Sequence, residues 1–203
     1  MAKTKLTLVN HSNDANNSPI VIFQKNIVPG FDDLAVAWRV VENLGLGDSH
    51  AFECPLEFGV GCADSWGNHT PTLLACSGQS FHMVESSSGN ILELSGHSQR
   101  PTEVEIRNDL RQGAISANIY KDNKLLATKM NIAPGQKAVF EFKPIIYIGV
   151  FESQITEGQI MNSAMIESIK TELSLERIVS ADILMTGRGP ASFNFELGNV
   201  VKV

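Results

Sequence analysis

The chain has 203 residues, of which 43% are hydrophobic and 19% are charged, and its formal net charge is −6. A chain of this length can bury enough apolar surface to fold without disulfides or metals, so we expect one domain over residues 1–203. Lys and Arg are scattered along an acidic sequence, which argues against a nucleic-acid partner because such proteins carry a basic stripe.

The first segment, MAKTKLTLVNHSNDANNSP, has two lysines but no continuous apolar stretch behind them, so it does not predict a signal peptide. No apolar run approaches the roughly 20 residues of a membrane helix, and we expect no transmembrane segment. Three cysteines, an odd number, are typical of a reducing compartment. The sequence therefore predicts a cytoplasmic protein.

Apolar residues alternate with polar ones along most of the chain, which is the pattern of half-buried β-strands. Gly, Ser, Asn or Pro interrupt the alternation about every ten residues, as in an antiparallel sandwich or barrel. The predicted strands up to residue 151, in chain order, lie within 5–9, 19–25, 34–41, 50–62, 72–77, 80–86, 90–96, 102–108, 114–132, 138–144 and 145–151.

The segment HAFECPLEFGVGCADSWGN, residues 50–68, shows this alternation most clearly. Read at a spacing of two, Phe52, Cys54 and Cys62 share one apolar face, while glutamates and glycines occupy the other. Cysteine is among the most buried residue types and often behaves as a small hydrophobe. We therefore expect both cysteines to lie in the core.

The same region contains the side chains that could form a metal site. They are His50, Cys54, Cys62, His69 and Cys76. Zinc sites commonly pair their ligands across a tight turn, with spacings such as C-x2-C, and no such spacing occurs here. The sequence therefore favours core cysteines over a metal centre.

The clearest hairpin is predicted for residues 114–132, where Asp122 and Asn123 tolerate the left-handed backbone of a tight turn. The following tetrapeptide, Ala-Pro-Gly-Gln at 133–136, has Pro and Gly in the order of a type II turn. Both features predict antiparallel strands joined by short connections.

One stretch of the C-terminal third is ambiguous. Its apolar residues fall at steps of four, which fits a helix as well as a strand: Met161, Met165, Ile169 and Leu173. The stretch has several Ser and Thr residues and no convincing helix cap. We expect strands over 171–186, a turn at 187–190 and a last strand within 191–203, and leave 159–170 open between helix and strand. The predicted fold is all-β, an antiparallel β-sandwich of two packed sheets of short strands, with room for one short helix near 159–170.

The segment AISANIYKDNKLLATKMNIAPGQKAVFEFKP and, less closely, LAVAWRVVENLG resemble uncharacterised bacterial all-β proteins of similar length. The resemblance covers most of the chain. Because no activity is attached to those proteins, the resemblance implies no catalytic or binding residues.

Asn and Asp side chains gather in several predicted loops, where their oxygens could ligate Ca²⁺. These residues are Asn13, Asp14, Asn16, Asn17, Asp32, Asp33, Asp48 and Asp64. None of the loops matches the spacing of an EF-hand, and Asn and Asp are ordinary turn formers. We therefore expect turns here, with no bound metal and no cofactor.

No nucleophile elbow, H-E-x-x-H, P-loop or S-x-x-K motif is present. The Gly45-Leu46-Gly47 stretch lacks the third glycine and the βαβ context of a dinucleotide fingerprint. His82 lies within a predicted strand, where a satisfied or surface histidine is the favoured interpretation. The sequence predicts no catalytic residues.

The best candidate for a binding site is the loop ADSWGNHTP, residues 63–71. Its predicted ligand-binding residues are Asp64, Trp66, Asn68 and His69, because an aromatic ring can stack on a sugar or a protein while polar neighbours satisfy hydroxyl groups. The competing interpretation, which the sequence favours, is that Trp66 folds back as a lid over the core.

The leading hypothesis is a non-catalytic β-sandwich protein that binds a carbohydrate or protein ligand through its end loops, or self-associates, as a homo-oligomer. The first alternative is a membrane-active, toxin-like protein, because soluble all-β domains can assemble on lipid. The second alternative is a metal-dependent all-β enzyme that uses His50, His69 or His82.

Overall fold

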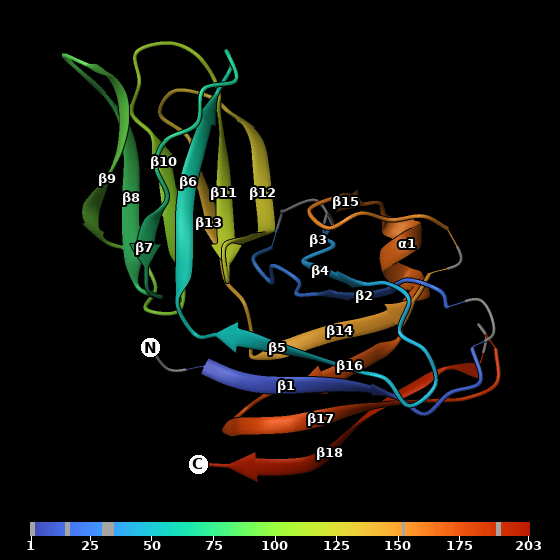
Figure 1. Cartoon of the computed structure of the whole chain (residues 1–203). Helices are drawn as coiled ribbons and strands as arrows, with labels where there is room; N and C mark the ends of the chain where they lie inside the picture. Colours follow the sequence, from blue (N-terminus) through green and yellow to red (C-terminus); the bar gives the residue numbers. More distant parts are fainter. Residues whose placement is uncertain (1–2, 15–16, 30–34, 152, 190–191) are drawn as a thin grey trace. The chain divides into compact units, whose positions relative to one another are not determined.

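The computed structural model describes residues 3–14, 17–29, 35–151, 153–189 and 192–203 and shows an all-β protein with one short helix (Figure 1). The chain divides into two compact units. Unit 1 comprises Met1–Lys25, Asp33–Leu56 and Lys143–Val203, and unit 2 comprises Asn26–Asp32 and Glu57–Phe142. The all-β prediction is confirmed, whereas one domain over residues 1–203 stays a prediction.

In its described residues, unit 1 is built from two four-stranded sheets and a two-stranded one. The first sheet has the order β18 (Asn194–Lys202), β17 (Ile178–Thr186), β1 (Lys3–Asn10) and β5 (Ser49–Pro55). The second has the order β16 (Thr171–Ser174), β14 (Ile145–Val150), β2 (Ile20–Phe23) and β4 (Arg39–Val41). β15 (Ile160–Met161) pairs with β3 (Ala35–Val36).

All four residues of β2 are buried, because both faces of this strand are covered. Val21 and Phe23 belong to an apolar cluster with α1 (Ser163–Ser168) and the β3 and β15 segments. Ile20 and Ile22 are also buried and, by the alternation of a strand, lie on the opposite face. A continuous apolar run of this kind is typical of a strand in the middle layer of a structure.

The open stretch 159–170 contains α1, so the short helix is confirmed. Asn162 caps it: its side-chain oxygen accepts a hydrogen bond from the main-chain N–H of Met165 at 2.9 Å. The sequence analysis found no convincing helix cap in this stretch. That interpretation is wrong, because Asn is a strong N-cap residue. Within the described part of the chain, no helix is long or apolar enough to cross a membrane.

The part of unit 2 that the structure describes consists of two four-stranded sheets. One has the order β12 (Lys124–Ile132), β11 (Ile115–Lys121), β6 (Phe58–Asp64) and β7 (Leu73–Ala75). The other has the order β13 (Lys137–Phe140), β10 (Val104–Asn108), β8 (Gln79–Ser86) and β9 (Gly89–His97). The predicted hairpin is β11–β12, with Asp122 and Asn123 at φ of 53° and 57° in its turn.

Two strand pairs among the described strands are parallel, β1 with β17 and β8 with β10. The two sheets that contain these pairs are therefore mixed, whereas the pairs in the other described sheets are antiparallel. A parallel pair requires a crossover connection, and local alternation carries no information about which distant strand becomes the neighbour.

The segment 50–68 forms two strands, β5 and β6, rather than one. The alternation holds on both sides of the break, and Cys54 and Cys62 are buried as predicted. Leu56, at the bend between the strands, is instead 61% exposed. On the outward face of β6, a side chain at Gly59 would collide with Thr72 and approach Tyr120, and one at Gly61 would also approach Tyr120. The two glycines therefore leave room for the tyrosine ring.

Candidate functional site

The loop that follows β6 is held together by the carboxylate of Asp64. Its Oδ1 accepts hydrogen bonds from the main-chain N–H groups of Trp66 and Asn68, both at 2.9 Å, and its Oδ2 accepts one from the side-chain amide of Asn68 at 2.9 Å. The N–H of Asp64 donates to the carbonyl of Asn68 at 2.9 Å. Gly67 completes the turn at φ 85°.

These hydrogen bonds keep Asp64 ionised. The side-chain amide of Asn68 lowers the pKa of the Asp64 carboxyl below its ordinary value of 3.8, and the main-chain N–H groups of Asn68, Trp66 and Gly67 lower it further. Asp64 therefore presents a fixed negative charge at the end of β6.

The side chain of Trp66 is 86% exposed. The interpretation of Trp66 as a lid over the core is therefore wrong. The turn closed by Asp64 directs the residue outward, and period-two reasoning cannot be extended into a turn of this kind.

A pocket of about 260 Å³ opens beside this loop within unit 2. It is lined by Asp64, Asn68, His69 and Thr70 from the loop, and by Met83, Ser88, Gly89 and Asn90 from β8 and the β8–β9 hairpin. The structure thus brings together three of the four predicted residues, whereas Trp66 is not among the residues that line the pocket.

Sequence reasoning missed the contribution of the β8–β9 hairpin. Residues 86–90, SSSGN, form a tight turn in which the Ser86 hydroxyl donates to the carbonyl of Gly89 at 2.7 Å. The turn itself was readable from its Ser, Gly and Asn residues. Its position beside the Asp64 loop could not be predicted from the sequence, because β8 and β6 belong to different sheets of unit 2.

The pocket offers polar groups that are not used by the fold. In the part of the chain that the structure describes, the side chains of His69 and Asn90 make no hydrogen bond or ion pair. The Thr70 hydroxyl accepts a hydrogen bond from the N–H of Cys62 at 3.0 Å and keeps its own hydrogen to donate. The buried Met83 side chain supplies an apolar wall.

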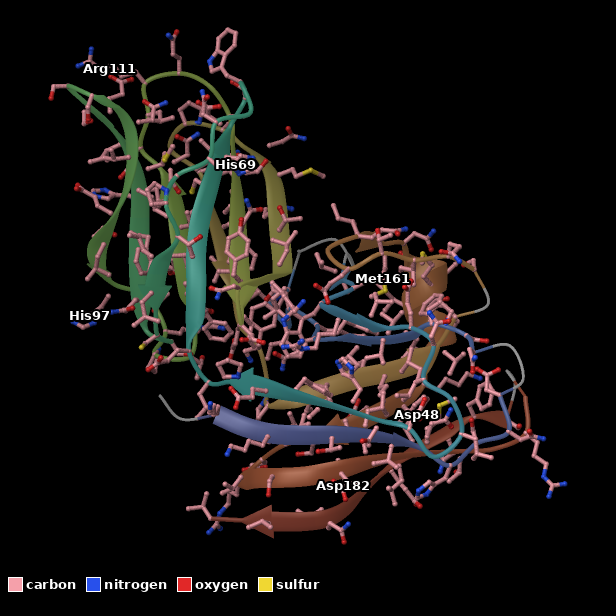
Figure 2. The ribbon with its side chains drawn as sticks, viewed as in Figure 1. Asp48, His69, His97, Arg111, Met161 and Asp182 are labelled. Atoms are coloured by element: carbon pink, nitrogen blue, oxygen red, sulfur yellow. The ribbon has the colours of Figure 1, made fainter. Side chains whose placement is uncertain are left out.

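Figure 2 shows His69 and Arg111 toward one end of unit 2 and His97 toward the other. Arg111 follows β10, and its N–H donates to the carboxylate of Glu85 on β8 at 3.2 Å. The guanidinium lies 3.6 Å from the same carboxylate. The pocket end of unit 2 therefore also carries an exposed ion pair.

The candidate metal ligands do not converge. Among the described residues, no group of three or more His, Cys, Asp or Glu side chains could hold a metal ion. Cys54 and Cys62 are buried and Cys76 is exposed, and burial raises the pKa of the Cys62 thiol to about 12.

Two of the calcium candidates, Asp14 and Asp48, accept main-chain hydrogen bonds within their own loops. Asp14 accepts a hydrogen bond from the N–H of Ser18 at 2.7 Å, and Asp48 accepts one from the N–H of Gly45 at 3.0 Å. Asn16, Asp32 and Asp33 lie outside the described residues.

His82 lies on the solvent-facing side of β8 between two carboxylates. Its Nδ1 is 3.1 Å from Asp109 and its Nε2 is 3.1 Å from Glu93. Since a neutral imidazole has only one N–H, both contacts can be hydrogen bonds only when the ring carries both protons. His82 is thus a surface histidine with two carboxylate neighbours, which agrees with the interpretation that the sequence favoured.

Neither protein-family models, curated proteins nor solved structures match this chain.

Proposed function

We propose that the protein is a non-catalytic binding protein that recognises a carbohydrate through the pocket of unit 2. The observation that carries the proposal is the convergence of Asp64, Asn68 and His69 on one pocket with unused polar groups. Those side chains come from a loop braced by its own hydrogen bonds, so little ordering is needed when a ligand binds.

The chemistry of the pocket suits hydroxyl groups, each of which both donates and accepts. Asp64 Oδ2 and the side-chain amide oxygen of Asn68 supply acceptors, and the Thr70 hydroxyl supplies a donor. The Asn90 amide supplies both kinds of group. A volume of about 260 Å³ is below the roughly 300–1,000 Å³ of pockets that enclose drug-sized ligands, and it suits a single sugar ring.

The exposed indole of Trp66 supports a longer ligand. It lies in the sequence between Asp64 and Asn68, both of which line the pocket, and the fold has no need of it because it is 86% exposed. An aromatic face can cover the apolar face of a neighbouring sugar ring. With about a dozen ligand atoms in contact, we expect a dissociation constant of about 1 mM for a monosaccharide and tighter binding for an oligosaccharide.

The test is a glycan-array screen followed by NMR titration of the isotope-labelled protein with any saccharide that binds. We expect Asn90→Ala and His69→Ala to weaken binding by at least about tenfold, because each removes a group that the fold does not use. The matched control is His97→Ala, an exposed histidine toward the other end of unit 2. Failure of the wild-type protein to bind any glycan, or equal binding by all three variants, would overturn the proposal.

A protein ligand, self-association as a homo-oligomer and a cytoplasmic location stay predictions of the sequence. The same holds for the membrane-active and metal-dependent alternatives. Liposome leakage and metal analysis of untagged protein are the measurements that address these two.

A further inference from the structure

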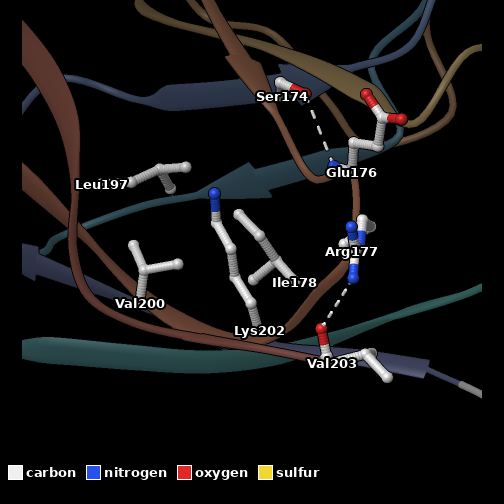
Figure 3. A pocket seen from close by; sticks show the side chains of 8 residues that line it. All are labelled: Ser174, Glu176, Arg177, Ile178, Leu197, Val200, Lys202 and Val203. Atoms are coloured by element: carbon white, nitrogen blue, oxygen red, sulfur yellow. Dashed lines mark hydrogen bonds between the residues drawn. The ribbon is translucent and has the colours of Figure 1, made fainter.

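Unit 1 contains a second, larger pocket of about 630 Å³, within the range of small-molecule sites. Figure 3 shows the residues that line it, which come from the β16–β17 turn and from β18: Ser174, Glu176, Arg177, Ile178, Leu197, Val200, Lys202 and Val203. None of these residues takes part in the saccharide pocket, so the two sites are independent.

The pairing of β17 with β18 explains why apolar and cationic groups meet here. Ile183 pairs with Leu197 and Ile178 pairs with Lys202, and partners across a ladder lie on the same face of a sheet. Ile183 and Ile178 are buried. Leu197 and Lys202 therefore project from the edge strand on the same side as core residues.

Two compensating bulges make this arrangement possible. Between the pairs Asp182–Gly198 and Ser180–Val201, β18 contains one residue more than β17, and the following step contains one residue more in β17. Asn199 lies in the bulge at φ 48°, and its amide donates to the Asp182 carboxylate at 2.6 Å. A bulge of this kind re-aims side chains at a sheet edge.

The pocket has a cationic side made by Lys202 and Arg177. Lys202 makes no side-chain hydrogen bond or ion pair within the described part of the chain, and Figure 3 shows its amine beside Ile178, in the space toward Leu197. The Arg177 guanidinium donates one hydrogen bond, to the main-chain oxygen of Val203 at 3.3 Å. The carboxylate of Glu176 points away from the lysine amine (Figure 3).

The pocket also has an apolar side. Ile178 forms its buried floor, Leu197 is half-buried, and Val200 is 39% exposed. An aliphatic chain laid along these three side chains would remove apolar surface from water, which is favourable. Two cations next to an aliphatic strip are complementary to an anion that carries a hydrocarbon chain.

We propose that this pocket binds an aliphatic carboxylate. The carboxylate accepts hydrogen bonds from Lys202 and from the free donors of Arg177, whose planar fork matches carboxylate geometry. The hydrocarbon chain lies along Ile178, Leu197 and Val200. The proposal is for binding alone and involves no covalent step.

The test is an NMR titration of the full chain with octanoate below its micelle concentration, with octan-1-ol and acetate as comparison ligands. We expect octanoate to shift the methyl signals of Ile178, Leu197 and Val200. Octan-1-ol, which lacks the charge, and acetate, which lacks the chain, should each bind at least about tenfold more weakly.

Two pairs of variants separate the charge from the apolar strip. Lys202→Met keeps the aliphatic stem and should weaken octanoate binding at least about tenfold, while Lys170→Met, at an exposed lysine outside the pocket, should leave it unchanged. Val200→Asp should abolish binding, whereas Val179→Asp, at an exposed valine that does not line the pocket, should not. Circular dichroism checks that each variant is folded.

Three results would overturn the proposal. They are equal binding of octanoate and octan-1-ol, unchanged octanoate binding by Lys202→Met, or methyl shifts confined to residues outside the pocket.

Discussion

The carboxylate of Asp64 holds both the main-chain N–H and the side-chain amide of Asn68, each at 2.9 Å. The same two residues line the pocket of unit 2. Asp64 and Asn68 therefore hold the loop together and also present polar groups to the pocket. This is why a binding test is cleaner at Asn90 and His69, whose side chains the loop does not use.

The Asp64 loop should come apart in acid only at unusually low pH. The folded pKa of Asp64 lies below its ordinary value of 3.8, so its contribution to loop stability is present above the unfolded pKa and is lost as pH falls through the folded one. The measurement is the pH dependence of the Trp66 main-chain amide signal by NMR. Asp64→Asn, which carries no charge, should flatten that titration. A wild-type midpoint above the ordinary carboxyl value would contradict the assignment.

The two tryptophans should differ sharply in their effect on stability. Trp66→Ala should leave the free energy of unfolding within about 0.5 kcal/mol of the wild type, because the side chain is 86% exposed. Trp38 is fully buried and packs edge-on against Phe52, with 6.2 Å between the ring centroids. Trp38→Ala should therefore lower the free energy of unfolding by about 3–5 kcal/mol. Urea unfolding followed by circular dichroism gives both values, and similar costs for the two variants would refute the exposure of Trp66.

The free energy of unfolding should fall at alkaline pH because the unfolded chain can ionise Cys62 more easily than the folded protein can. Burial raises its folded pKa to about 12 from 9.0, so the contribution of the neutral thiol is fully present below the unfolded pKa and is lost as pH rises toward the folded value. Between about pH 8 and about pH 10, the stability difference between wild type and Cys62→Ala should shrink by about 1 kcal/mol. Tyr120, whose pKa burial also raises, is present in both proteins, but the charge of Cys62 raises that pKa further, so only the burial contribution cancels. A pH-independent difference would show that Cys62 does not titrate in this way.

Two glycines in the turn after β17 have similar backbone conformations but should differ in the stability that is lost on substitution by alanine. Gly187 and Gly189 have φ of 116° and 123°, so alanine is strained at either position. At Gly187, a Cβ would also lie 2.8 Å from the main-chain carbon of Ser192, whereas at Gly189 it would meet nothing within 4 Å. Gly189→Ala should cost about 1–3 kcal/mol and Gly187→Ala clearly more, measured by thermal unfolding. Equal costs would mean that the turn relaxes around the added methyl group.

Period-two alternation predicted most of the strands and the burial of Cys54 and Cys62, because it records which side of a strand faces water, but it did not reveal the bend at Leu56 that divides β5 from β6. The turn at Asp122 and Asn123 was equally readable, since its left-handed backbone is a property of the residues themselves. Both features depend on neighbours in the sequence.

The binding sites depend on distant neighbours instead. Asn90 reaches the Asp64 loop through the stacking of two sheets, and Lys202 joins Ile178 through a bulged pairing of β17 with β18. Trp66 faces outward because a carboxylate two residues earlier closes the turn. Many sheet orders satisfy one alternating pattern equally well, and only the order that closes the whole core fixes which loops and strand edges meet.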